Sequence, residues 1–244
     1  MINDYLKKYK EQFESEHSLM TVNNHHVHNP DPEYWNILLG EVKYNPDFWK
    51  GKNAFDFGCG CGRNLYNLST LANWNNINGC DISQSNAKYA KKWFDSKNKT
   101  SANCTTWESK GDDIQPSGWF GTNVKYDFIM SHIVFQHISN YNVRFKIITD
   151  MFNSLNNGGL CSLHFMDLGT LEKSITIAPN SLNFSDKDES STYYENSFKY
   201  KNCKVLNKKY LVNDFEKIGF KNVKVEVGRD FSTLATTYYI KGYR

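Results

Sequence analysis

The sequence predicts an α/β protein built on a doubly wound, mostly parallel seven-stranded sheet with an antiparallel C-terminal strand. Short apolar strands alternate with helix-compatible segments from residue 53 to residue 165, a pattern typical of parallel sheets. A glycine-rich turn joins the first strand directly to its helix. The chain closes with a helix, a Gly-Phe pair and two strands at 223–227 and 236–240. An N-terminal helical extension and an insertion after the fifth strand complete the predicted architecture.

Length and composition favour a single cytoplasmic domain. The chain has 244 residues and a net charge of +3, with lysine and arginine mixed among acidic residues, so a nucleic-acid partner receives little support. No stretch reaches the ~20 apolar residues that span a bilayer, and the first eight residues lack an apolar signal core. The six cysteines contain no C-x-x-C pair and are expected to be reduced and buried. We therefore expect no membrane association.

Residues 1–50 are expected to form an N-terminal helical cap, and residues 51–244 the sheet domain. Apolar side chains at Tyr5, Leu6, Tyr9 and Phe13 have helical spacing. A second helix is expected around residues 34–38, ending at Gly40. Between these helices lies a loop with histidines at positions 25, 26 and 28. Two interpretations stay open for this loop: a metal site, or a polar loop without the geometry to aim the rings.

The glycine-rich turn follows the first strand, an apolar segment that starts at Asn53 and ends in the acidic residue Asp56. Glycine falls at positions 58, 60 and 62, and a helix-compatible segment begins at Arg63 and Asn64. Glycine suits a sharp turn in which the backbone closely approaches a ligand, and the N-terminus of the new helix favours an anionic group. The even spacing differs from the G-x-G-x-x-G of dinucleotide-binding turns. Cys59 and Cys61 within the turn are interpreted as small fillers, with a metal or redox pair as the alternative.

Acidic residues mark the ends of the next two strands. Asp81 ends a strand at 77–82 and lies 19 residues beyond Gly62, a spacing typical of a carboxylate that binds ribose hydroxyls. Ser83 follows as the expected N-cap of a helix that runs to residue 95. A third strand, 104–107, leads to Asp112 and Asp113. Because parallel strands end at one edge of the sheet, these side chains are expected to converge there.

The fourth and fifth strands complete the parallel part of the predicted sheet. Strand 126–131 is followed by His132 and His137. A helix over 142–155 is expected to end at Asn156-Asn157-Gly158-Gly159, with the fifth strand at 160–165. Both histidines therefore lie just beyond a strand end, where a ligand is expected.

Three motifs together resemble the class I S-adenosylmethionine-dependent methyltransferases, of the Rossmann-like, small-molecule type. They are D-x-G-x-G-x-G from Asp56 to Gly62, the triplet Asp81-Ile82-Ser83, and the stretch from Asp127 through Gly158-Gly159-Leu160, and the resemblance covers residues 53–165. It implies S-adenosyl-L-methionine as cofactor and S-adenosyl-L-homocysteine as product. Asp112 matches the position that accepts from the adenine amino group. The implied cofactor-binding residues are Asp56, Gly58, Cys59, Gly60, Gly62, Arg63, Asn64, Asp81, Ile82, Asp112, Asp113, Ile114 and Ser131.

The resemblance also suggests a catalytic residue. His137 is the first candidate for a general base, because several small-molecule methyltransferase families have a functional histidine at this offset. His132 is the second candidate, with a role in shaping the methionine pocket as its alternative. Packing or helix capping remains open for both histidines, and His164 is interpreted as a core residue. Gln136 stands where some relatives have a metal- or anion-binding glutamate, so metal-assisted catalysis is not expected and no metal ligand is predicted.

The expected acceptor is a small polar molecule or glycan precursor, methylated on oxygen or nitrogen by in-line displacement. The fourth strand lacks the Asp/Asn-Pro-Pro-aromatic motif of methyltransferases that act on nucleobases. The insertion at 166–208 is expected to cover the substrate. Its aromatic residues could form a cage for an amine or a stacking face for a sugar ring; the alternative is ordinary packing of the insertion onto the sheet. The enzyme is expected to be a monomer or homodimer.

Three alternatives remain for the function. An RNA methyltransferase would use a basic face, and an aminopropyltransferase would be expected to have an acid where Arg63 stands. A non-catalytic S-adenosylmethionine-binding subunit would bind the cofactor without turnover. The basic face consists of Lys199, Lys201, Lys204, Lys208 and Lys209.

Overall fold

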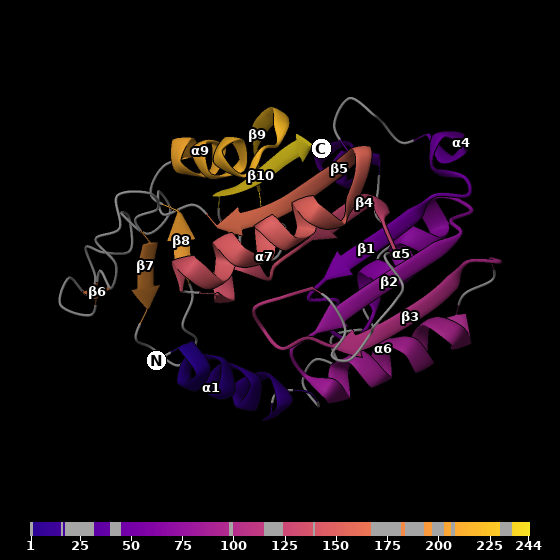
Figure 1. Cartoon of the computed structure of the whole chain (residues 1–244). Coiled ribbons are helices and arrows are strands. Elements are labelled where there is room, and N and C mark those ends of the chain that lie inside the picture. Colours follow the sequence, from indigo (N-terminus) through magenta and orange to yellow (C-terminus); the bar gives the residue numbers. More distant parts are fainter. Residues whose placement is uncertain are drawn as a thin grey trace.

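A seven-stranded sheet forms the centre of the part of the chain that the structure describes (Figure 1). The structure is a computed structural model. It describes residues 2–15, 17, 32–39, 45–97, 100–114, 124–138, 140–166, 182–183, 193–196, 203–205, 208–229 and 236–244. In sheet order the strands are β3 (Asn103–Glu108), β2 (Asn76–Asp81), β1 (Asn53–Phe57), β4 (Tyr126–Ser131), β5 (Leu155–Met166), β10 (Thr236–Tyr243) and β9 (Lys221–Arg229).

The strand directions confirm the predicted doubly wound topology. β3, β2, β1, β4 and β5 run parallel to one another, and β10 is antiparallel to both β5 and β9. The chain runs outward from β1 to β3 and then crosses back to β4 on the other side of β1. The switch between β1 and β4 is the place where a sheet of this kind opens to a ligand at the C-terminal ends of its strands.

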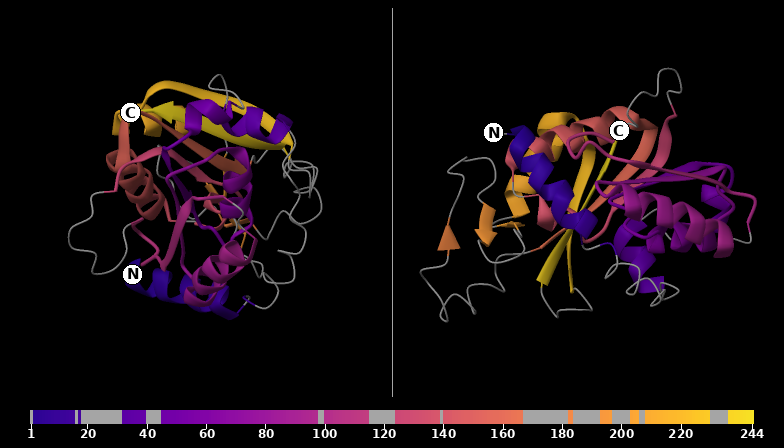
Figure 2. Two further views of the ribbon diagram at one scale, coloured as in Figure 1. Left: turned by 90° about the vertical axis from the view of Figure 1, so that its right-hand side faces the viewer. Right: turned by 90° about the horizontal axis from the view of Figure 1, so that it is seen from below.

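Helices cover both faces of the sheet, as Figure 2 shows. Two clusters of buried apolar residues, one on each face, form the core. Ala54 and Phe55 alternate between these clusters, which explains why β1 is apolar on both sides. One face carries α7 (Tyr141–Ser154) and α9 (Lys208–Ile218); the other carries α3 (Pro32–Leu39), α4 (Pro46–Trp49), α5 (Arg63–Leu71) and α6 (Gln84–Lys97).

The glycine pair after α7 does not separate helix from strand as predicted. α7 ends at Ser154, and Gly158 and Gly159 lie inside β5, which already begins at Leu155. The pairing of β5 with β4 shifts register across this segment. The Gly158 N–H donates to the Arg244 carbonyl, and the Arg244 N–H donates to the Gly159 carbonyl. The glycines therefore form an irregular strand start that binds the C-terminal residue.

Two further elements lie beside the C-terminal ends of the parallel strands. The predicted N-terminal helix is α1 (Ile2–Ser15), which contacts α6 (Figure 1). A second sheet contains β6 (Leu182–Asn183), β7 (Tyr193–Asn196) and β8 (Cys203–Val205), and β8 contacts β5 and the short 3-10 helix η2 (Phe135–His137). The loop with histidines 25, 26 and 28, and most of the insertion at 166–208, lie outside the described residues.

Candidate active site

A cavity of about 290 Å³ lies at the C-terminal ends of β1, β2 and β4. Its walls come from the turn after β1, the end of β2, the loop after β3, the segment after β4, and α1. The sequence places polar groups at each of these strand ends, and the fold brings them around one space. The lining residues are Tyr9, Phe13, Phe57, Gly58, Cys59, Gly60, Cys61, Arg63, Asn64, Asp81, Ile82, Ser109, Gly111, His132, Ile133, Val134, His137 and Ile138.

The turn after β1 requires glycine for two physical reasons. Gly58 has a φ of +71°, and a Cβ there would lie 2.3 Å from the Val134 Cγ2 atom. Gly62 has a φ of +98°, and its Cβ would lie 3.1 Å from the backbone of Ala90 in α6. The Gly58 N–H donates to the Cys80 carbonyl at 2.8 Å, which ties the turn to β2. The turn is thus a tightly packed cradle whose backbone faces the cavity.

Asp81 is buried and fully engaged at the end of β2. Its Oδ2 accepts from the Gly60 N–H at 2.9 Å, and its Oδ1 accepts from the Ser83 N–H at 2.9 Å and the Asn86 amide at 3.2 Å. Burial raises the pKa of Asp81, and these three hydrogen bonds oppose that rise. The carboxylate lines the cavity and joins the turn after β1 to the N-terminus of α6.

Asp56, one strand away, has a different environment. Its carboxyl is buried, lies outside the cavity lining, and neither oxygen has a hydrogen-bond partner among the residues that the structure describes. Burial raises its pKa well above the usual value, the nearby Arg63 guanidinium opposes the rise, and Asp81 adds to it. Burial therefore favours the neutral, protonated form of Asp56, which lies on β1 just before the glycine turn.

The loop after β3 presents different residues from those predicted. Ser109 and Gly111 line the cavity, and the Ser109 Oγ both accepts from the Gly111 N–H and donates to the Asp113 carbonyl. Asp112 instead pairs with Lys146 of α7 at 3.2 Å. Ile114 is buried in the core. Asp113 lies 3.8 Å from Lys110, and burial raises its pKa.

Seven of the predicted cofactor residues line the cavity and six do not. Ser131, at the end of β4, is buried and donates to the Phe57 carbonyl at 2.9 Å, so it supports the cavity wall from behind. Burial raises the pKa of Cys61 to about 12, which leaves a protonated thiol, as suits a filler. Those in the lining are Gly58, Cys59, Gly60, Arg63, Asn64, Asp81 and Ile82; those outside it are Asp56, Gly62, Asp112, Asp113, Ile114 and Ser131.

His132 lines the cavity and belongs to a cluster of rings from the segment after β4 and from strands β5 and β10. Its Nε2 lies 3.2 Å from the Tyr239 hydroxyl of β10. The ring of buried His164, on β5, lies 4.8 Å from the His132 ring between centroids. Burial lowers the pKa of His132 well below its usual value, and His164 adds to the effect. His132 is therefore a neutral imidazole at physiological pH.

His137 lines the cavity from η2. Its Nε2 lies 3.3 Å from the Gln136 amide nitrogen, and its ring is 5.5 Å from the ring of Phe13. This contact holds the His137 ring beside the Gln136 side chain. Both predicted catalytic histidines thus face the same cavity.

The segment between these histidines has a strained backbone. Ile133 has a φ of +63°, which is rare for a β-branched residue. Its N–H donates to the Nδ1 of His164 at 3.3 Å. Strained backbone of this kind is concentrated at functional sites. A buried core histidine therefore holds the turn that carries His132 and Val134.

Two cavity residues of α1 were predicted only as an apolar helix face. Tyr9 and Phe13 line the cavity, and their rings are 4.8 Å apart. Helical spacing placed them in an amphipathic helix but gave no sign of what they would contact. Ile133, Val134 and Ile138 were likewise missed as lining residues, because apolar residues after a strand carry no signal of their own.

The structure describes only part of the predicted basic face. Lys208 and Lys209, at the start of α9, are exposed, whereas Lys199 and Lys201 lie outside the described residues. Within the described ranges, no cluster of three or more histidine, cysteine or acidic side chains is arranged to hold a metal ion. None of the helices in the part that the structure describes is both long and apolar enough to cross a membrane.

Comparisons with known proteins agree with the fold. Residues 55–161 match the model of a family described as "Methyltransferase domain". No curated protein sequence matches the chain. A solved S-adenosylmethionine-dependent methyltransferase from Methanosarcina mazei is 16% identical, with a TM-score of 0.59 over 80% of this chain and 93% of that chain.

Two similar structures contain S-adenosylhomocysteine. Magnesium protoporphyrin IX methyltransferase from Synechocystis is 15% identical, with a TM-score of 0.55 over 86% of this chain and 78% of that chain. The N-methyltransferase NodS from Bradyrhizobium japonicum is 10% identical, with a TM-score of 0.56 over 87% and 88% of the two chains. At these identities the likeness establishes the fold.

Proposed function

We propose that this chain is a class I S-adenosylmethionine-dependent methyltransferase and that it methylates an oxygen or nitrogen of a small polar molecule or glycan precursor; the match of residues 55–161 to a methyltransferase-domain family supports this. The observation that carries this proposal is the single cavity in which the glycine turn, Asp81 and two histidines face one another. S-adenosylmethionine is the proposed cofactor and S-adenosylhomocysteine the product.

The residues around the cavity fit this cofactor. The backbone after β1 forms a cradle that a side chain at Gly58 would fill. Asp81 offers carboxylate oxygens at the position expected for ribose hydroxyls. Asp56 and Arg63 lie near the N-terminus of α5, where the charged amino-acid group of the cofactor would be favoured. Ser109 and Gly111, together with Ile82, are proposed to contact the adenine side.

The chemistry follows from positioning and from proton transfer. When bound, S-adenosylmethionine supplies a methyl group on a sulfonium and leaves as a neutral thioether. Holding an acceptor in line with that methyl can provide ~7–11 kcal/mol of the barrier. The aromatic rings of Tyr9 and Phe13 are proposed to exclude water from the acceptor end.

His137 and His132 are the proposed bases. Each presents an imidazole to the cavity, and His132 is held in its neutral form by burial. A hydroxyl acceptor must lose a proton during transfer, and a neutral imidazole within hydrogen-bond reach can accept it. Tyr239 is proposed to orient His132 through the hydroxyl contact at 3.2 Å. An amine acceptor that arrives neutral has less need of either base.

We propose that residues 1–50 and 166–208 close the site around a small acceptor. α1 supplies Tyr9 and Phe13, and β8 of the insertion contacts η2, which carries His137. Five described cysteines are buried free thiols, which is consistent with the proposed cytoplasmic location. A monomer or homodimer is the proposed assembly.

Calorimetric titration with S-adenosylmethionine, S-adenosylhomocysteine and NADH tests the cofactor. Asp81→Ala should weaken binding of the two sulfur nucleotides by about 100-fold, because it removes hydrogen bonds to a charged group. Asp127→Ala is the matched control, since this carboxylate accepts from the Asn53 N–H at the opposite end of the sheet. Equal loss in both variants, or binding of NADH alone, would overturn the assignment.

Turnover is then measured as S-adenosylhomocysteine formed with panels of hydroxyl and amine acceptors. His137→Ala and His132→Ala are compared at saturating cofactor. Loss of turnover with unchanged cofactor affinity would support a base; no effect of either change would remove that role. Cofactor binding without turnover on any acceptor would favour a non-catalytic subunit. Salt-dependent RNA binding with RNA methylation would favour the RNA alternative.

A further inference from the structure

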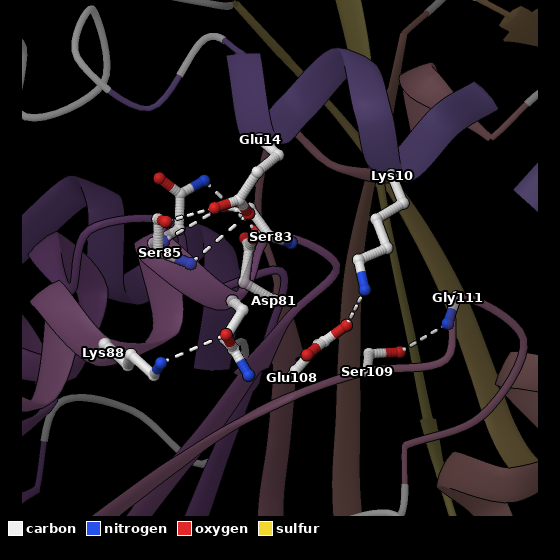
Figure 3. Close-up of polar contacts among 11 residues, drawn as sticks. Lys10, Glu14, Asp81, Ser83, Ser85, Lys88, Glu108, Ser109 and Gly111 are labelled. Atoms are coloured by element: carbon white, nitrogen blue, oxygen red, sulfur yellow. Dashed lines mark hydrogen bonds and ion pairs between the residues drawn. The ribbon is translucent and has the colours of Figure 1, made fainter. Parts of the chain in front are cut away.

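α1 contacts the cavity and the neighbouring strand ends with different side chains. Tyr9 and Phe13 line the proposed acceptor end, and the Phe13 ring lies 5.5 Å from that of His137. Lys10 and Glu14 instead reach the ends of β3 and β2 (Figure 3). One short helix therefore carries both an acceptor wall and contacts to the cofactor loops.

Glu14 makes the most extensive of these contacts. Its Oε2 accepts from the Ser83 hydroxyl at 2.6 Å and from the Ser85 N–H at 3.3 Å, and its Oε1 accepts from the Ser85 hydroxyl. These hydrogen bonds hold the pKa of Glu14 below its usual value. The carboxylate thus satisfies donors at the N-terminus of α6, where negative charge is favourable.

The same turn carries Asp81. The Ser83 N–H donates to the Asp81 Oδ1 at 2.9 Å while the Ser83 hydroxyl donates to Glu14, so this one serine lies between the two carboxylates. A second connection runs through Asn86, whose Oδ1 lies 2.7 Å from the Nδ1 of His17 and whose amide donates to Asp81. Asp81 is therefore held by Gly60 on one side and by Ser83 and Asn86 on the other, and the N-terminal segment contacts these last two residues.

We propose that Glu14 is a positioning residue of the cofactor site: from α1 it holds the β2–α6 turn that presents Asp81, and so links cofactor binding to the acceptor wall. The inference rests on the proposed function. Because coupling between two binding events is reciprocal, a cofactor bound at Asp81 strengthens the docking of α1, and a docked α1 strengthens cofactor binding. Cofactor binding should then favour the docked position of Tyr9 and Phe13 at the acceptor wall.

The first test is calorimetric titration of S-adenosylhomocysteine into wild type, Glu14→Ala, Glu14→Gln and Glu11→Ala. Glu14→Ala should weaken binding about tenfold, as for loss of hydrogen bonds to a charged group. Glu14→Gln keeps one acceptor oxygen and should recover part of the affinity. Glu11 is the matched control, because it lies on the same helix, is exposed, and among the described residues pairs only with Lys7, at 4.0 Å.

The second test is hydrogen exchange of the backbone amides in residues 2–15. In wild type, S-adenosylhomocysteine should slow exchange in this segment; in Glu14→Ala the slowing should be largely lost while the sheet amides stay protected. A double-mutant cycle with Ser85→Ala should give non-additive affinities, since both changes remove the hydrogen bond from the Ser85 hydroxyl to Glu14.

The outcomes separate the two proposals. If wild type does not bind S-adenosylhomocysteine, the proposed function falls and the positioning role falls with it. If wild type binds and Glu14→Ala binds as tightly as Glu11→Ala, with α1 still protected by the ligand, only the positioning role is overturned.

Discussion

The ends of β1 and β2 carry the same residue type in opposite hydrogen-bonding states. Asp56 and Asp81 lie on neighbouring parallel strands, and their side chains belong to residues only 1% and 7% exposed. Three donors hold Asp81, whereas Asp56 has no hydrogen-bond partner among the described residues. Two buried carboxyl groups on neighbouring strands therefore differ in their hydrogen bonding, and we expect them to have different roles.

The difference teaches that burial and position in the sheet do not determine what a carboxylate does. The Asp81 carboxylate is hydrogen-bonded to neighbouring groups of the protein, and these hydrogen bonds hold the turns around it. Burial is the main cause of the raised pKa of Asp56; the Arg63 guanidinium opposes this rise and the Asp81 carboxylate adds to it. Substitutions that remove the charge but keep the shape should therefore affect the two positions in opposite ways.

The largest expected effect is that of Asp81→Asn. The new amide would turn an N–H₂ toward one of the N–H donors of Gly60 or Ser83, and the free energy of unfolding should fall by about 3 kcal/mol. Asp56→Asn should leave it unchanged or raise it at pH 7.5. Urea unfolding followed by circular dichroism measures both. Equal destabilisation of the two variants would contradict the contrast.

The sequence predicted the convergence of these residues but not their states. Strand alternation and the order of the motifs were sufficient for the sheet, because parallel strands buried on both faces have a strong apolar pattern. The same reasoning brought the glycine turn, Asp81, His132 and His137 to one edge. The hydrogen-bond donors that reach Asp56 or Asp81 depend on the detailed geometry of the turns. Residue spacing in the sequence does not specify that geometry.

The loop after β3 and the helix α1 show the same limit. Asp112 was placed near adenine by motif position, yet in the structure it faces Lys146 while Ser109 and Gly111 line the cavity. A shift of one or two residues in a loop exchanges the side chains that face a ligand. Glu14 gave no signal at all, because an acidic residue on an exposed helix face is ordinary and its partner lies 69 residues away.

The glycine turn lies between Asp56 and Asp81 in the chain, and its residue Gly58 can be compared with Gly51, a glycine outside the turn. Gly58→Ala should lower the free energy of unfolding by about 2–3 kcal/mol, since φ is +71° and the new Cβ would meet Val134. Gly51 has a nearly identical φ of +73° but open space around it, so Gly51→Ala should cost only about 1 kcal/mol. The difference between their urea midpoints isolates the close approach at the cavity. Equal midpoints would show that Val134 moves aside freely.

The pH dependence of stability should sharpen the contrast at Asp56. Burial raises its pKa in the folded state above the unfolded value near 3.8, so the folded state binds more protons between those two values. Its contribution to stability is fully present below pH 3.8 and is lost as pH rises through the folded pKa. The stability of Asp56→Asn relative to wild type should therefore increase from pH 4 to pH 8 in urea titrations. A difference that is constant with pH would mean that Asp56 stays ionised throughout.

The smallest expected effect concerns the outer contact of α1 with the sheet. Lys10 pairs with Glu108 at the end of β3, and both side chains are substantially exposed to solvent. Lys10→Met should lower the free energy of unfolding by less than about 1 kcal/mol, because exposed ion pairs contribute little and are screened by salt. The loss should shrink further in 1 M NaCl, measured by thermal melts in low and high salt. A loss that persists unchanged in high salt would instead point to packing of the lysine stem, and would make this contact as structural as the hydrogen bonds around Asp81.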